Sequence, residues 1–461
     1  MKYYSQADNI SWLEEYKARY NAGLEARRIV ASFSKRFFSE HVPCDGFSDI
    51  EMLGCPSHFF EDELMSILNM EGRKGLTWKY YAKKILYFLR QQNILKNLKA
   101  YLQHPEDQQS FLEGAVLIDQ YCNPLSDISL KSVQAQVDDI ADRVRKVLKA
   151  KNLRHPSLSS KAGEVLMVPE VELQRQVLDA MNCVLYEQLK YKGNEIDYYN
   201  SLNSYIHQVL IRRTGIPISL SVLYLTISRQ LGVRLEPVNF PSHFLLRWCQ
   251  GEEGTKILQH TGVSGLGLWA DYVLLLLAEP LIYRNTFHLS IVFLLLKVLD
   301  ILQHIQALDP SQHGAVGYLV QHTLEHIERR KEEVGPEVKH HSDEKHKDVF
   351  FSIGLIMKHK RYGYNCVIYG WDPTCMMGHE WIRNMNVHSL PHGDGSCRYA
   401  AQENLEYNLE PHEIPHPDIG RYFSEFSGTH YLANSELEVR YPEDLELTCA
   451  TVQKNYSAGK E

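Results

Sequence analysis

Residues 215–248 bring a helix start and a histidine close together in the sequence, an arrangement that can activate a nucleophile. The turn Gly215-Ile216-Pro217 precedes apolar residues at the spacing of one buried helix face, namely Leu220, Leu223, Tyr224, Ile227 and Leu231. Gly232 closes this helix. His243 then opens a stretch that alternates between two faces as far as Trp248, which is typical of a half-buried strand. We therefore predict a helix, then strands, with His243 at the start of one strand.

Two stretches resemble known families. The segments GNEIDYYNSLNSYIHQVLIRRTGIPISL and NFPSHFLLRW, within residues 193–248, resemble the transglutaminase-like module of the bacterial SirB family. The segments FSIGLIMKHKRYGYNCVIYGWDPTCMMGHEWIRNM, YAAQENLE and HPDIGRYFSEF, within residues 351–426, are similar to the YccV-like, hemimethylated-DNA-binding small β-barrel. The order of these modules, after the helical region that begins WLEEYKARYNAGLEARRIV, resembles that of a family of F-box proteins.

The first resemblance implies a vestigial catalytic site. In catalytic transglutaminases a cysteine at a helix N-terminus is ionised with the help of a strand histidine, and an acidic residue orients that histidine. A gapless overlay puts Pro217 in the place of the cysteine, so the nucleophile is missing; Ser219 carries the nearest hydroxyl, and His243 matches the histidine. We expect no catalysis and a structural or ligand-contact role for His243. The rival hypothesis, a serine or cysteine hydrolase, requires turnover that disappears in Ser219→Ala or His243→Ala.

A second candidate site combines basic and aromatic residues. Its members are Lys358, Lys360, Arg361, Tyr364, Trp371 and Trp381. The basic side chains could hold phosphates while the aromatic rings stack on bases. Nearby acidic residues, among them Glu403 and Glu406, oppose phosphate binding. We therefore favour a solvated turn above a core of aromatic residues, and a surface that recognises a protein or a degron rather than DNA.

Composition indicates an intracellular protein of several domains. The 461 residues carry a net charge of −8, which argues against general nucleic-acid affinity, because that affinity needs lysine and arginine to displace phosphate counterions. The nine cysteines are odd in number and never spaced C-x-x-C, so neither a disulfide framework nor a zinc ribbon is indicated. The start of the chain has no apolar signal region, and the longest apolar runs are too short for a membrane span. We expect a cytoplasmic or nuclear location.

The sequence indicates neither a cofactor nor a metal. It contains no phosphate-binding glycine motif, so nucleotide chemistry is unsupported. The H-x-x-E-H spacing at His322–His326 matches inverted zinc peptidases, but Leu319, Leu324 and Ile327 favour an ordinary amphipathic helix with a solvated histidine pair. The histidines of the tract 340–346 are interpreted as part of a charged, solvated linker over 329–347.

The predicted fold class is α+β multidomain. The N-terminal and central regions are mostly helical and contain the transglutaminase-like helix-strand unit, and a small β-barrel follows. The first helix spans residues 7–40, where Trp12, Tyr16, Tyr20 and Leu24 recur every four residues. The predicted parts are a helical region 1–105, the truncated transglutaminase-like module 106–256, a divergent segment with helices and linker 257–345, the YccV-like barrel 346–440 and a tail 441–461.

The F-box resemblance implies a non-catalytic subunit that positions protein substrates for an SCF-type ubiquitin ligase. An adaptor and a cullin would then be its partners, and DNA is the alternative partner. We identify no F-box between Met1 and Tyr20 and expect the chain to begin just after one. The resemblance fails after Lys256, where we expect a missing or replaced internal segment, and a barrel strand is missing at Gly393-Asp394.

Overall fold

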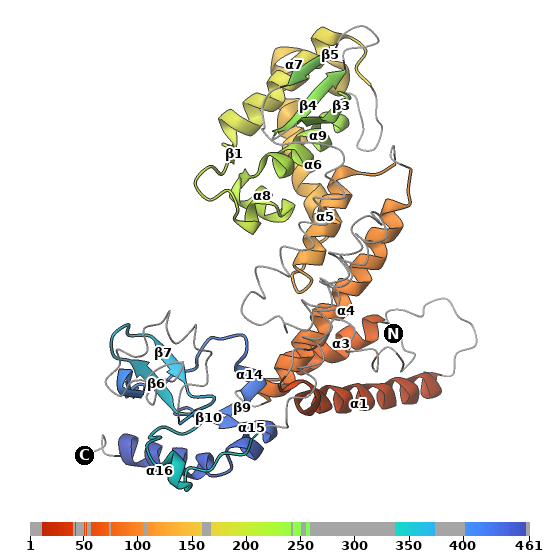
Figure 1. The fold of residues 1–461 in the computed structure, drawn as a ribbon. Coiled ribbons are helices and arrows are strands. Elements are labelled where there is room, and N and C mark those ends of the chain that lie inside the picture. The colour runs from red at the N-terminus through yellow and green to blue at the C-terminus, as the bar shows by residue number, and fades with distance from the viewer. Residues whose placement is uncertain are drawn as a thin grey trace, which may run out of the picture. The chain divides into compact units, whose positions relative to one another are not determined.

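The computed structural model describes two compact units, one formed by residues 1–89 and 288–461 and the other by residues 90–287 (Figure 1). The described residues are 12–39, 42, 50, 52, 57–72, 75–105, 108–158, 167–240, 243–249, 255–258, 337–373 and 402–457. No helix among them is both long and apolar enough to cross a membrane. The predicted H-x-x-E-H helix and the expected missing barrel strand lie outside the described residues.

The 90–287 unit combines helices with one antiparallel sheet. Its described α-helices are the second part of α4 (Leu76–Leu102), α5 (Phe111–Cys122), α6 (Leu130–Lys151), α7 (Val171–Asn182), α8 (Ile206–Arg212) and α9 (Pro217–Gln230). Helix α7 continues into the π-helix η2 (Cys183–Gln188). The sheet has the order β3-β4-β5, with strands β3 (Leu235–Phe240), β4 (His243–Cys249) and β5 (Thr255–Leu258). A short parallel pair joins β1 (Lys192–Gly193) to β2 (Thr214–Gly215).

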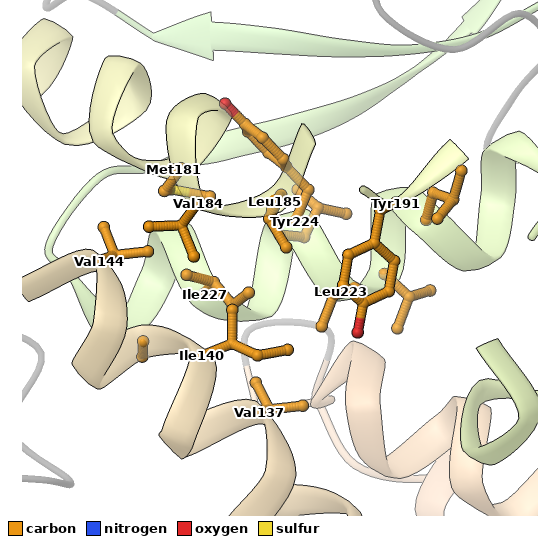
Figure 2. Packing of buried hydrophobic residues seen from close by; sticks show 14 of the residues in the cluster. Val137, Ile140, Val144, Met181, Val184, Leu185, Tyr191, Leu223, Tyr224 and Ile227 are labelled. Carbon is orange, nitrogen blue, oxygen red and sulfur yellow. The ribbon is translucent and has the colours of Figure 1, made fainter. Parts of the chain in front are cut away.

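The core of this unit lies where α6, the α7–η2 helix and α9 meet. Figure 2 shows Val137 and Val144 of α6, Met181 of α7 and Ile227 of α9 directed towards one another. The whole apolar face predicted on α9 is buried, which confirms the helical spacing. Helix α6 begins where Ser129 accepts a hydrogen bond from the backbone N–H of Ser132. These helices form a packed platform beneath the sheet.

The N-terminal helices of the other unit are α1 (Trp12–Phe37), α3 (Ser57–Leu68) and the first part of α4 (Leu76–Leu102). The predicted first helix is confirmed, but its buried face carries Ala26, Val30 and Phe33. Trp12, Tyr16, Tyr20 and Leu24 are all more than half exposed. The reason is geometric. An α-helix has about 3.6 residues per turn, so a strict four-residue repeat turns by about 40° at each step and winds away from one face.

The described residues of the C-terminal part, 337–373 and 402–457, form two small sheets. Strands β6 (Ile356–His359), β7 (Asn365–Val367) and β8 (Leu405–Tyr407) pair antiparallel in the order β7-β6-β8, and β9 (Phe423–Phe426) forms a hairpin with β10 (Tyr431–Ala433). A bridge between Leu355 and His430 connects them. Short helices α14 (Ile419–Tyr422) and α15 (Ser435–Arg440) flank the hairpin, and α16 (Asp444–Ser457) follows.

The stretch 337–347 packs on this module and does not form the solvated linker that the sequence predicts. His346 is buried with its ring against the edge of Trp371, at a centroid distance of 5.0 Å. Ser342 donates its hydroxyl and its backbone N–H to Glu443, which lowers the pKa of that carboxyl to about 2. The expected tail also packs, because Asp444 of α16 is buried and accepts the indole N–H of Trp371 at 2.9 Å.

The N-terminal helices pack against the C-terminal hairpin within this unit. Thr77 at the start of α4 donates its hydroxyl to the carbonyl of Phe423 at 3.0 Å. Arg421 donates from Nε to the carbonyl of Phe38 at 2.9 Å, and the Arg440 guanidinium lies 4.4 Å from the centre of the Phe38 ring. Residues separated by more than three hundred positions therefore share one core, which the sequence pattern did not indicate.

Gly420 allows this close approach, because a Cβ atom there would lie 2.3 Å from the carbonyl oxygen of Leu76 and 2.6 Å from the Cβ of Tyr80. We expect Gly420→Ala to destabilise this unit by about 1–3 kcal/mol, the usual cost of forcing an extra methyl into packed backbone. Urea unfolding of the full chain measures the change. Gly370→Ala is the matched control, since its nearest atom is the Tyr441 hydroxyl at 3.4 Å. Equal stability of the two variants would contradict this packing.

Candidate functional site

The predicted vestigial site lies at the N-terminus of α9. Pro217 is the first residue of the helix, where its missing N–H costs nothing. Ser219 is 3% exposed, and its hydroxyl contacts the carbonyl oxygens of Asn203 at 2.7 Å and Ile216 at 3.0 Å. A serine hydroxyl that is buried and shared between two carbonyls ties loops together and is not poised for attack. His243 is the first residue of β4, paired with Phe240, and its imidazole lies outside the described residues.

Gly215, directly before this helix, is required by the position of Ser219. A Cβ atom at residue 215 would lie 2.7 Å from the Ser219 hydroxyl and 3.1 Å from the side chain of Val209. Only glycine leaves room for the hydroxyl to reach the Asn203 carbonyl. In the signature Gly-Ile-Pro-Ile-Ser of this chain, the glycine therefore leaves room for the packing of the serine.

Asn203 is the buried centre of this region. Its side chain is 0% exposed, and its amide Nδ2 donates to the carbonyls of Asp197 at 2.7 Å and Tyr198 at 3.2 Å. Its Oδ1 accepts from Asn194 Nδ2 and from Arg212 Nη1, each at 3.2 Å. All four hydrogen-bonding sites of the amide are thus satisfied, as a buried polar group requires. Asn203 was not among the residues predicted from the sequence.

The residues that Asn203 holds form a loop between β1 and α8, which we name the 194–203 loop (Figure 1). Its own side chains shape its turns, since Asn194 Oδ1 accepts from the N–H of Asp197 at 3.0 Å and Asn200 Oδ1 from the N–H of Leu202 at 3.0 Å. The asparagine-rich sequence of this stretch was the available signal. It indicates turns, but not which asparagine is buried.

A carboxylate–histidine pair fixes the other end of this region. Asp119 of α5 is 0% exposed, and its Oδ2 accepts the backbone N–H of His207 at 3.0 Å and lies 2.5 Å from His207 Nδ1. The other ring nitrogen of His207 faces the side-chain amide of Gln208 at 2.9 Å. Although the pair resembles the base of a hydrolase, its contacts join α8 to α5. We interpret it as a structural clamp beside the 194–203 loop.

The basic and aromatic candidate residues gather only in part. Lys358, Lys360, Arg361 and Tyr364 lie at the β6–β7 turn, and all four are exposed. Two further residues of the turn, His359 and Tyr362, complete an aromatic group in which the rings of Tyr362 and Tyr364 are nearly parallel at 6.4 Å and both contact the buried His359 ring. Trp371 is 5% exposed and belongs to the core, so it does not join this surface; Trp381 lies outside the described residues.

The basic residues of this turn have neighbours within the protein. Lys358 of β6 lies opposite Glu406 of β8 in the strand register. Lys360 donates from Nζ to the carbonyl oxygen of Glu403 at 2.7 Å. The side chain of Arg361 lies over the ring of Tyr362 at 5.4 Å. A phosphate bound at this turn would therefore lie beside a strand, β8, that carries the acidic residue Glu406.

Comparison with known proteins matches both modules. A model of the transglutaminase-like superfamily matches residues 131–262, and one of hemimethylated DNA-binding protein YccV like matches residues 349–430. F-box only protein 21 of Homo sapiens is 64% identical over 543 residues, which cover 100% of this chain and 86% of that protein. The Mus musculus protein of the same name is 62% identical with the same coverage. A UPF0162 protein of Xylella fastidiosa is 45% identical over 80 residues, 17% of this chain and 28% of its own.

The two resemblances inferred from the sequence are confirmed by these matches. The alignment with the human protein is longer than this 461-residue chain, which agrees with an internal segment that is absent here. No solved structure matches.

We expect Asn203→Ala to release the 194–203 loop and to lower the free energy of unfolding by about 1–3 kcal/mol, because the substitution removes the donor to two part-buried carbonyl groups and leaves Asn194 and Arg212 without their acceptor. Hydrogen exchange of the loop amides and urea unfolding measure the two effects. Asn200→Ala serves as control, since Asn200 bonds only within the loop. Exchange that rises equally in both variants would show that Asn203 is not the group that holds the loop.

Proposed function

The chain belongs to the F-box only protein 21 family, and from this premise we propose that it is the substrate-recognition subunit of an SCF-type ubiquitin ligase. The observation that carries the proposal is 64% identity to the human F-box protein across the whole of this chain. An adaptor and a cullin would join through an F-box. A partner enzyme would transfer ubiquitin, and this chain would position the target.

The proposed mechanism is proximity. Holding a substrate lysine beside a charged ubiquitin carrier raises the effective concentration of the two reactants and needs no catalytic group on this chain. The α9 N-terminus supports this interpretation, because Pro217 replaces a nucleophile and the Ser219 hydroxyl is engaged by carbonyl groups. We assign the contact with substrate to the transglutaminase-like module, residues 106–256.

Co-purification with the SCF adaptor and cullin tests this proposal. We expect a version that carries an F-box ahead of residue 1 to retain both partners, because the F-box is the module that docks the adaptor. The chain as printed is the matched comparison. If it also binds, the helices before residue 100 provide an adaptor surface of their own. If neither version binds, the proposed ligase role is wrong.

DNA binding is the second candidate function. The match of residues 349–430 to the hemimethylated DNA-binding family and the exposed Lys358, Lys360 and Arg361 favour it. The net charge of −8 and the position of Glu406 opposite Lys358 in the sheet oppose it. We rank it below protein recognition for this reason.

Fluorescence anisotropy with a hemimethylated duplex and its unmethylated counterpart distinguishes the two functions. We expect weak binding that the triple variant Lys358→Ala/Lys360→Ala/Arg361→Ala leaves unchanged within about threefold, because acidic neighbours offset the basic turn. Lys345→Ala/Lys347→Ala is the control for a loss of positive charge elsewhere. Tight, salt-dependent binding that disappears only in the triple variant would establish the DNA-binding function instead.

A further inference from the structure

The 194–203 loop exposes large apolar side chains to water. Ile196 is 101% exposed and Tyr199 is 85% exposed, while Tyr198 and Leu202 are each more than a third exposed. Single exposed apolar residues are common, but four within seven positions of one loop form a patch, and such patches mark sites of protein interaction. Isoleucine and tyrosine are also poor choices for a loop that has only to remain soluble.

The loop holds these side chains in a fixed arrangement. Asn203 donates to the carbonyl groups of Asp197 and Tyr198, which lie between Ile196 and Tyr199 in the chain. Its own carbonyl accepts from the Ser219 hydroxyl and from the N–H of Ile216. The loop is therefore attached to the N-terminus of α9 from within. A surface that is already ordered loses less conformational entropy when a partner binds, so it can use a small apolar patch effectively.

The charges of the loop indicate what it binds. Glu195 and Asp197 flank Ile196 on both sides, and residues 193–203 contain no lysine, arginine or histidine. One oxygen of Asp197 accepts from Asn200 at 2.8 Å, which fixes the direction of that carboxylate. A partner that covers Ile196 must bring positive charge to these two carboxylates. The exposed tyrosine rings add faces on which a lysine or arginine side chain can lie.

We propose that the 194–203 loop is the substrate-docking surface of the transglutaminase-like module and that it binds protein segments in which lysine or arginine flanks a large apolar residue. The apolar residue packs on Ile196 and Tyr199, and the basic residues pair with Glu195 and Asp197. This proposal rests on the proposed ligase function, since it names the class of substrate segment. Nucleic acid is the wrong partner for this surface, because both carboxylates repel phosphate.

Two pools of fluorescein-labelled peptides test the proposal on the full chain. Both pools share a central Leu-Phe, and the flanking residues are Lys and Arg in one and Asp and Glu in the other. We expect the basic pool to bind at least about tenfold more tightly than the acidic pool, and Ile196→Ser/Tyr199→Ser to weaken that binding by about tenfold or more. Leu409→Ser, at an apolar side chain that is 73% exposed and lies outside the module, is the control and should bind as the wild type does.

A charge reversal tests the electrostatic half of the proposal. Glu195→Lys should abolish the preference for the basic pool or transfer it to the acidic pool, while Glu187→Lys, on the preceding π-helix, should not. Equal binding of the two pools, or full binding by Ile196→Ser/Tyr199→Ser, would overturn the proposal. So would sedimentation analysis in which the wild type dimerises and the same double variant does not, because the loop would then bind a second copy of the chain.

The peptide-binding experiments and the co-purification experiment test the loop proposal and the ligase proposal separately. If the F-box-carrying version retains the adaptor but binds neither peptide pool, the loop proposal fails and the ligase role stands. If the basic pool binds through the loop but no adaptor is retained, the docking surface stands and the ligase role fails.

Discussion

The hydrogen bonds of one buried amide organise the candidate recognition region. Asn203 replaces the water that the carbonyl groups of the 194–203 loop would otherwise need, and Ser219 reaches its carbonyl because Gly215 leaves space. Burying a polar side chain is unfavourable unless each donor and acceptor is paired, so the arrangement tolerates little variation. The N-terminus of α9 and the exposed loop are therefore parts of one structure, in which the Ser219 hydroxyl is bonded to the backbone of Asn203 at the end of the loop.

The C-terminal module follows a similar principle with other groups. Asp444 accepts the indole N–H of Trp371 and the backbone N–H of Ile353, which joins the last helix to the start of the first sheet. The stretch 337–347 adds His346 against the same tryptophan. Contacts at Gly420 and Phe38 bring the N-terminal helices into the same unit. A DNA-binding surface built on Trp371 is incompatible with this core, whereas a scaffold for protein recognition gains rigidity from it.

Much of the fold could be predicted because its signals are local. The apolar face of α9, the strand before His243 and the strand that begins at His243 all follow from spacing and turn chemistry. The exposed face of α1 could not be predicted with the same rule, because a four-residue repeat fits a helix without specifying which side meets a neighbour. The interpretation of the charged stretch 337–347 as a solvated linker was wrong for a related reason. Histidine and lysine are typical of solvated linkers, yet here they pair with Glu443, Asp444 and Asp372.

The sequence by itself determined the two module families, the fold class, and the absence of a cysteine at the start of α9, since each of these depends on residues that are adjacent or regularly spaced. The tertiary structure alone decided which polar residues matter. Asn203, Asp119 and Asp444 look like ordinary surface residues in the sequence, and each is buried. The partners of Asp119 and Asp444 lie more than seventy positions away, and those of Asn203 lie on the loop before it and the helices after it. Burial together with hydrogen-bond satisfaction is a property of the assembled chain, which no local pattern encodes.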